Sequence, residues 1–338
     1  MAILTTKEVN IKIYLPLGKC TFIDRKQLRI TLSLTSTTFL PMKKLLALLL
    51  FGVVYGATAQ DDDLLKLLDQ EKPQETNYTI ATFKSTRIIN GHSVEGMAAK
   101  HLDFRISHRF GQLSDGAYNL WGLDQAYIRI ALEYGLTNRI LVGVGRSNYQ
   151  KAYDGFMKVK LLRQSTGKVT MPVSVSLFGS VAVNTLQMNL PTPDATFAFS
   201  NRLAYTTQLL VARKLNERFS VQLTPTWVHR NYVETSPEPH DVFALGIGGR
   251  VKISKRVAFN IDYYHVFSEQ LMKTNTNSLA VGFDIETGGH VFQLQFTNST
   301  GMIEKTFITE TTGDWGKGNI HYGFNISRTF SFDRKRAK

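Results

Sequence analysis

Cysteine is almost absent from this chain of 338 residues, in which Cys20 is the only one. A single thiol allows neither an internal disulfide nor a cysteine-ligated metal site. Beyond residue 60 the sequence also lacks any run of about 18 apolar residues, the length that a membrane-spanning helix needs. If this part of the chain enters a membrane, it must therefore cross it as a closed β-barrel.

Local catalytic signatures are missing as well. The chain contains no His-Glu-x-x-His, Gly-x-Ser-x-Gly or phosphate-loop pattern. Gly143-Val-Gly145 begins like a dinucleotide-binding fingerprint, but the third glycine and the helix pattern are absent. No two histidines have the spacing of metal ligands within one strand. We therefore predict that the protein is not an enzyme, with no catalytic residue, no metal and no cofactor.

Charge of one sign is in excess, and part of that excess lies in a targeting segment. Lys and Arg number 40 against 27 Asp and Glu, a net charge of +13. Residues 42–59 resemble a signal peptide, with Lys43 and Lys44 before an apolar run and Ala57-Thr58-Ala59 at its end. We expect residues 1–41 to be a non-native extension, because a signal peptide works at an N-terminus.

Removal of residues 1–59 takes away eight bases and two acids, so the net charge falls to +7. No basic block with interleaved aromatic residues remains, and we expect no nucleic-acid partner. The rest divides into a periplasmic tether over residues 60–76, a β-barrel domain over 77–332 and a C-terminal tail over 333–338. Export by the signal peptide places the protein in the bacterial outer membrane.

From residue 101 onward, apolar and polar residues alternate in segments of roughly ten residues, the length of a tilted transmembrane strand. In residues 126–135, Ile128, Ile130 and Leu132 share one face while Arg129 and Glu133 share the other. Twelve such segments follow one another. Short links alternate with long ones, as in barrels with short periplasmic turns and longer outer loops. The fold class is therefore all-β: an outer-membrane-type antiparallel β-barrel of about twelve strands.

Residues 78–90 are rich in β-forming side chains but alternate poorly. Counting them as a strand would make the total odd, so we expect this segment to plug the lumen or to lie at its mouth. Among the long outer loops, 185–200 and 299–318 are expected to expose Phe197 and Trp315.

The polar faces of the strands predict a lumen of mixed charge. An Arg or Lys turned toward the bilayer midplane costs about 2–4 kcal/mol, so these faces should point inward. The candidate lumen-lining residues are Asp103, Arg105, Arg109, Arg129, Glu133, Lys158, Lys160, Arg202, Arg250, Asp262, Asp284 and Glu286. They admit three uses: salt bridges that fill a closed barrel, a constriction that selects ions, or a pocket for an anionic ligand.

Several runs resemble one family closely. They are residues 84–92, 102–111, 284–294 and 318–328, and Glu286-Thr-Gly-Gly-His-Val-Phe292 is the most specific stretch. The chain resembles a Bacteroidota family of membrane-bound β-barrel proteins described only as a domain of unknown function. That resemblance implies a barrel fold and an outer-membrane location, but no activity. The last strand also resembles the terminal strand that the barrel assembly machinery recognises, so that machinery and the lipid bilayer are the expected partners.

Three functions follow from these patterns. The working hypothesis is passage of a small solute through a narrow charged lumen, and the alternative is a non-transporting structural or surface-binding barrel. The second alternative is a lipid-modifying enzyme with a Ser and a His on the outer surface. His108, His229 and His265 have the outward register, but no serine is identifiably opposed to any of them.

Overall fold

The computed structural model describes residues 75–187, 197–233, 238–267, 274–287 and 290–332. The chain divides into two units, Met1–Glu71 and Lys72–Lys338, and every described residue belongs to the second. The proposed extension 1–41, the signal peptide 42–59, the tether as far as residue 74 and the tail 333–338 lie outside the described residues. What the sequence predicts for these four segments therefore stays a prediction.

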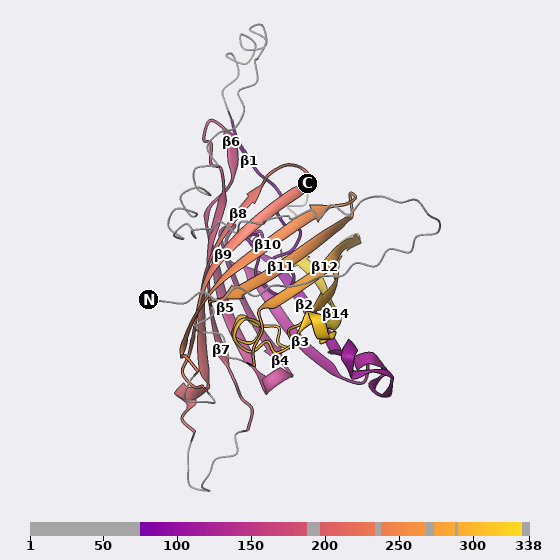
Figure 1. Ribbon diagram of the computed structural model, residues 1–338. Coiled ribbons are helices and arrows are strands. Elements are labelled where there is room, and N and C mark those ends of the chain that lie inside the picture. Colours follow the sequence, from indigo (N-terminus) through magenta and orange to yellow (C-terminus); the bar gives the residue numbers. More distant parts are fainter. Residues whose placement is uncertain (1–74, 188–196, 234–237, 268–273, 288–289, 333–338) are drawn as a thin grey trace, which may run out of the picture. The chain divides into compact units, whose positions relative to one another are not determined.

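Among the described residues, twelve antiparallel strands close into one barrel, which confirms the predicted fold class (Figure 1). The wall runs β10-β11-β12-β13-β14-β2-β3-β4-β5-β7-β8-β9 and closes by pairing β9 with β10. The first and last strands of the barrel, β2 and β14, are neighbours. The bounds are β2 (His101–Gln112), β3 (Ala126–Gly135), β4 (Ile140–Ser147), β5 (Tyr153–Leu162), β7 (Ser174–Val183), β8 (Leu203–Lys214), β9 (Phe219–Arg230), β10 (Asp241–Lys252), β11 (Val257–Val266), β12 (Ser278–Thr287), β13 (His290–Thr297) and β14 (His321–Ser331).

The alternation in the sequence separates residues that face the lumen from residues that face the outside of the barrel. In β3, Arg129 and Glu133 are buried toward the lumen, while Ile130 and Leu132 remain 49% and 43% exposed on the outer wall. The same two-residue period continues around the barrel, because successive side chains of a strand point to opposite faces. The outer wall is thus an apolar surface suited to lipid, and the strand register agrees with the period of the sequence.

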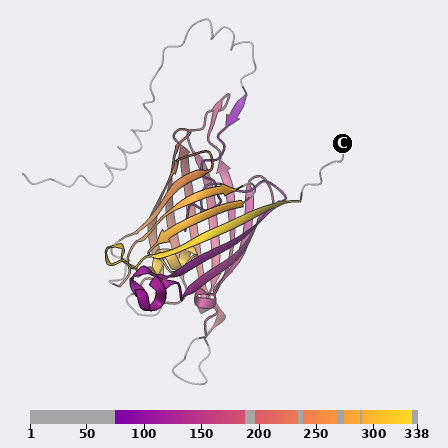
Figure 2. The ribbon, with the colours of Figure 1, turned by 90° about the vertical axis from the view of Figure 1, so that its right-hand side faces the viewer.

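A second, two-stranded sheet lies apart from the wall. Strand β1 (Thr76–Tyr78) pairs with β6 (Ser165–Gly167), which belongs to the connection between β5 and β7. We call this pair the mouth clasp, because it projects from the barrel end that carries the short turns (Figure 2). The short helices are η1 (Leu113–Asp115), η2 (Ala117–Gly122), η3 (Tyr149–Lys151), η4 (Phe199–Arg202), α3 (Glu304–Thr309) and η5 (Trp315–Lys317). None of the helices in the described ranges has the length and apolarity needed to cross a membrane.

Two segments fill the interior of the barrel. Residues 79–100, called the plug here, precede β2, and Phe83, Ile88 and Ile89 of the plug are at most 3% exposed. From the long-loop end, the connection between β13 and β14 turns inward, so that Phe307 of α3 packs against Tyr264 and Val228. The barrel therefore has a packed core rather than an open bore.

Candidate functional site

The plug is a hairpin whose tip lies deep in the barrel. Ile88 donates its backbone N–H to Gly91 at 2.8 Å, and Ser93 donates to Thr86 at 2.9 Å. Gly91 is required at the tip because a Cβ there would lie 2.0 Å from the hydroxyl of buried Tyr264. Both ends of the plug lie at the short-turn end, since β1 precedes it and β2 follows. Of the segment between 78 and 90, Tyr78 belongs to the mouth clasp and Ile80 is exposed, whereas residues 85–90 are buried inside the lumen.

Two wall residues hold the tip. The carboxylate of Asp262 on β11 accepts the backbone N–H of Asn90 at 3.1 Å and of Gly91 at 2.7 Å. The guanidinium of Arg109 on β2 donates to the Asn90 side chain, and also to the carbonyls of Ser299, at 2.7 Å, and of Gly301. Arg109 thus joins the plug to the inward-folded connection between β13 and β14.

Other wall charges hold the middle of the plug. The ammonium of Lys158 on β5 donates to the carbonyls of Thr86, at 3.1 Å, and Ser93, at 2.9 Å. Glu133 accepts from the Thr86 hydroxyl at 2.6 Å, and Arg105 donates to the same hydroxyl at 2.8 Å. Buried charges are costly unless hydrogen bonds satisfy them, and here the plug supplies many of those bonds.

Some lumen charges pair within the wall instead. Arg129 on β3 donates through Nε to Asp154 on β5 at 2.9 Å, and both side chains are buried. Arg105 also lies 3.3 Å from Asp103 and 3.6 Å from Glu133. The wall therefore contains ion pairs that do not depend on the plug.

Arg87 and His92 bring two bases of the plug itself into the interior. Arg87 lies 3.2 Å from Glu304 of α3 and donates to the Asn90 carbonyl at 2.6 Å. Burial lowers the pKa of Arg87 and raises the pKa of Glu304, while the charge of each opposes the effect of burial on the other. Burial, with the nearby charges of Arg87 and Lys158, holds the pKa of His92 well below 6.5, so His92 is neutral.

One side of the interior is apolar. The His92 ring lies 4.6 Å from the ring of Phe156 and 4.3 Å from that of Phe178, centroid to centroid. Phe156 and Phe178 form a buried cluster with Leu141 and Leu210, all directed inward from β4, β5, β7 and β8. The plug is thus held by apolar packing on this side and by charges and hydrogen bonds elsewhere.

The twelve predicted lumen residues fall into three groups in the structure. Buried within the wall are Asp103, Arg105, Arg109, Arg129, Glu133, Lys158, Asp262 and Asp284. Half-buried nearer the short-turn mouth are Lys160, Arg250 and Glu286. Arg202 is different: it lies in η4, before β8 begins, and donates to the carbonyls of Asn184 and Leu186 at the long-loop end. The chain has left the wall at that position, so the alternation no longer sets the direction of the side chain.

Several partners of these residues were not predicted from the sequence. Asp154 could have been identified from the sequence. It lies four residues before Lys158 on β5, so its side chain points to the same inward face. Arg87, His92 and Glu304 lie outside the regular strands, and no periodicity marks their burial.

The outer loops need two corrections. Residues 298–311 do not extend outward, because Phe307 and Ile308 are inserted in the barrel interior, where they bury apolar surface. Trp315 and Phe197 are half-buried rather than exposed. Trp315 donates its indole N–H to the Leu279 carbonyl at 3.2 Å, and Phe197 packs edge-on against Tyr232.

The outward histidines do not form a catalytic pair with serine in the described part of the chain. His108 stacks on Phe324, His229 contacts Asp241 at 2.8 Å, and His265 lies 3.3 Å from the Asn277 amide. Within the same described ranges, no group of three or more His, Cys, Asp or Glu side chains could hold a metal ion.

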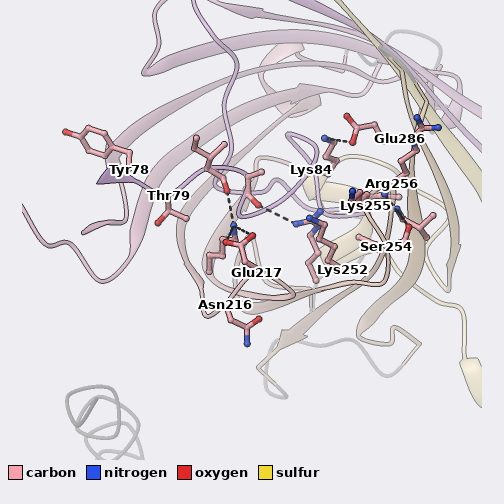
Figure 3. Close-up of a pocket in the computed structure, with 17 residues that line it drawn as sticks. Tyr78, Thr79, Lys84, Asn216, Glu217, Lys252, Ser254, Lys255, Arg256 and Glu286 are labelled. Atoms are coloured by element: carbon pink, nitrogen blue, oxygen red, sulfur yellow. Dashed lines mark hydrogen bonds and ion pairs between the residues drawn. The ribbon is translucent and has the colours of Figure 1, made fainter. Parts of the chain in front are cut away.

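A basic cavity of about 600 Å³ opens at the short-turn end, between the plug and the strand ends (Figure 3). Its lining includes the start of the plug, the β8–β9 turn and the β10–β11 turn. The charged residues around it are Lys84, Lys214, Glu217, Arg250, Lys252, Lys255, Arg256, Asp284 and Glu286. We call this cavity the basic vestibule.

The fold and the filled lumen define a membrane β-barrel of the outer-membrane type with an internal plug. Residues 83–330 match the family described as a membrane bound beta barrel domain (DUF5777), and the chain belongs to that family. No curated protein matches the chain.

Solved structures similar to the chain include other barrels. The NanC porin is 9% identical, with a TM-score of 0.42, and the match covers 69% of this chain and 100% of that one. The KdgM porin is also 9% identical, with a TM-score of 0.39 and coverage of 69% and 99%. Outer membrane phospholipase A from Escherichia coli is 9% identical, with a TM-score of 0.38 and coverage of 69% and 91%. Likeness at this level carries no argument about what the chain does.

Proposed function

We propose that this protein is a non-enzymatic outer-membrane barrel that passes a small solute, and that the plug closes its lumen at rest. One observation carries the proposal. Among the described residues, Lys158 and Asp262 make their hydrogen bonds to plug backbone, not to each other or to neighbouring wall residues. When the plug moves aside, these side chains would line a hydrated, mixed-charge channel.

The connectivity supports a plug that can move. Because β1 and β2 flank the plug at the same end of the barrel, the hairpin can leave through that mouth without threading the chain. The polar contacts it would break can be replaced by water, whereas the apolar side near Phe178 resists its departure. We therefore expect closure to be the dominant state and opening to be infrequent.

Planar-bilayer recordings on the purified protein test this function. A variant in which residues 80–98 are replaced by a Gly/Ser linker of equal length should give discrete, larger and more frequent current steps than the native chain. The native protein should open rarely, and proteoliposomes containing it should take up a small solute slowly. A folded plug-replaced barrel that stays silent would contradict the proposal.

The matched control replaces residues 113–121, none of which is buried, with a Gly/Ser linker of equal length. This variant should conduct like the native chain, because the plug is intact. Heat-modifiable gel mobility should show that all three barrels are folded, so that silence cannot be attributed to misfolding.

A non-transporting barrel is the second candidate, and the apolar half of the plug favours it. Phe83, Ile88, Ile89 and Val94 are buried against Ala212 and Ala280, as in a permanent core. In that case the native protein would show neither current steps nor solute uptake, although the plug-replaced variant conducts. Membrane fractionation of cells that express the full chain tests the outer-membrane location and the proposed signal peptide.

A further inference from the structure

The basic vestibule contains cations that the rest of the described chain leaves unpaired. Lys84 is paired with Glu286 at 2.6 Å and Lys214 with Glu217 at 3.1 Å. The third acid of the lining, Asp284, accepts a hydrogen bond from Gln293 at 2.7 Å. The side chains of Lys252, Lys255 and Arg256 have no hydrogen bond or ion pair to any described residue. The pairing of the acids therefore leaves a surplus of positive charge around the cavity.

These cations come from two neighbouring elements. Lys252 is the last residue of β10, and Lys255 and Arg256 belong to the turn that leads into β11. Figure 3 shows Ser254, Lys255 and Arg256 gathered on the side of the cavity nearer the Lys84–Glu286 pair, with Asn216 and Glu217 across from them. Three positive charges within five residues of the chain thus lie beside a single cavity.

The charge of the vestibule affects an acid that lies on its rim. Hydrogen bonds from Lys214, and the charges of Lys214 and Lys252, hold the pKa of Glu217 below its usual value although the side chain is fully exposed. Most of this shift comes from Lys214, the ion-pair partner of Glu217, and the charge of Lys252 adds a smaller part.

The register of the strands favours a soluble ligand over a lipid headgroup. Arg250 and Lys252 share the inward register of Ala244 and Gly248 on β10, so their side chains lie on the opposite face of the wall from Phe243 and Ile247. Lipid contacts the outer face of a barrel. A headgroup would have to leave the bilayer and enter the mouth to reach Arg250 and Lys252, whereas an anion dissolved at that end reaches them directly.

We propose that the basic vestibule binds a soluble anion carrying two or more phosphate or carboxylate groups. Lys255 and Lys252 supply point charges, and Arg256 supplies a planar guanidinium that can bind two oxygens of one group. Arg250 lies deeper in the cavity and donates to the Ala81 carbonyl of the plug at 3.4 Å, so it has donors left for the anion. The size of the cavity, about 600 Å³, is that of a small-molecule site.

Isothermal titration calorimetry of the detergent-solubilised full chain, with sodium pyrophosphate and separately with sodium citrate, tests this site. The native protein should bind at least one of these probes saturably, and more weakly as ionic strength rises. Substitution of Lys252, Lys255 and Arg256 together by Gln should raise the dissociation constant at least tenfold. Because no current is measured, the result is independent of whether the lumen opens.

The matched control carries the same loss of charge elsewhere: Arg139→Gln, Lys168→Gln and Lys317→Gln, all exposed and outside the vestibule. The control should bind like the native chain. Equal weakening in both triple variants would overturn the site, since it would indicate a non-specific response to net charge. Absence of saturable binding to either probe would also overturn it, as would binding seen only with phosphatidylglycerol vesicles, which would assign the cations to lipid.

Discussion

At the scale of single residues, His92 shows how the interior uses a titratable group without charge. Its ring is fully buried between Phe156 and Phe178, and Arg87 and Lys158 add positive charge nearby. A proton on this ring would be unfavourable both for burial and for charge repulsion. His92 therefore acts as an aromatic core residue at neutral pH and as a source of instability in acid.

The pH dependence of stability follows from that lowered pKa. The native state keeps His92 neutral, while the unfolded chain binds a proton below about pH 6.5, so the free energy of unfolding contributed by His92 falls as the pH drops below 6.5. His92→Phe should remove this contribution. Thermal loss of heat-modifiable mobility, measured from pH 8 to pH 5, should show the native chain losing stability relative to the variant.

Glu304 must be controlled for in that comparison, because its carboxylate lies 3.8 Å from Nε2 of His92. Burial raises its pKa, so its own contribution favours the native state in acid and is lost as the pH rises through the native pKa. The comparison is therefore made in a Glu304→Gln background, so that only the contribution of His92 differs between the two proteins. A constant gap between this background and its His92→Phe variant across this pH range would contradict the assignment.

Asp154 is the second residue whose role can be measured directly. Asp154→Asn keeps the size of the side chain but leaves the buried guanidinium of Arg129 without its counter-charge. Breaking a buried pair in this way costs about 3–5 kcal/mol. Urea titration of the folded barrel in lipid vesicles should show that loss, whereas Asp124→Asn, at an exposed position, should change the free energy of unfolding by less than about 0.5 kcal/mol.

At the scale of elements, the strands were predictable and the segments between them were not. The twelve barrel strands could be placed because Ile130 and Arg129 belong to environments that differ sharply, lipid and lumen, and a period of two separates them. The plug and α3 carry no such period. Phe83 and Phe307 are as apolar as a lipid-facing residue, and only tertiary packing reveals that they lie inside.

The same reasoning explains why the sequence predicted only the polar part of the lumen lining. Inward Arg and Asp residues are easily recognised, because the residues before and after them in the strand are apolar. Phe156 and Phe178 also point inward, but they are as apolar as residues that face lipid. An aromatic residue on the polar, inward face of a strand predicts that another segment packs against it inside the barrel. That signal was present in β5 and β7, and it points to the plug.

The outer face of β3 provides the element-scale prediction. Ile130→Arg places a charge on the outer wall near the middle of the strand, which should make folding into vesicles less favourable by about 2–4 kcal/mol. Tyr118→Arg, in η2 and 95% exposed, is the matched control and should have little effect. Similar costs for the two variants would mean that β3 does not face lipid with Ile130.

At the scale of the whole molecule, the barrel wall and the plug together form a single packed interior. Asp262 supplies the acceptor for two backbone N–H groups at the tip, and Arg109 links the tip to the connection between β13 and β14. Contacts from two separate strands of the wall, β11 and β2, meet on a few residues around Asn90. Loss of one of them should therefore loosen the plug as a unit.

Asp262→Ala tests that coupling. Each buried N–H left without an acceptor costs roughly 1–3 kcal/mol, and each 1.4 kcal/mol corresponds to about a factor of ten in population. Conducting events in planar bilayers should become at least tenfold more frequent than for the native chain. Asp241→Ala removes a carboxylate that contacts Trp227 and His229 at the outer surface, and it should leave the event frequency unchanged.

The mouth clasp has a mechanical consequence. Any tension applied to the chain before Thr76 reaches β1 first, and β1 is held by its three-residue pairing with β6. The clasp would bear that load before the plug does, and only after it parts would force pass to Lys84 and then to the hairpin tip. A pull from that end would thus extract the plug stepwise, with the clasp setting the threshold force.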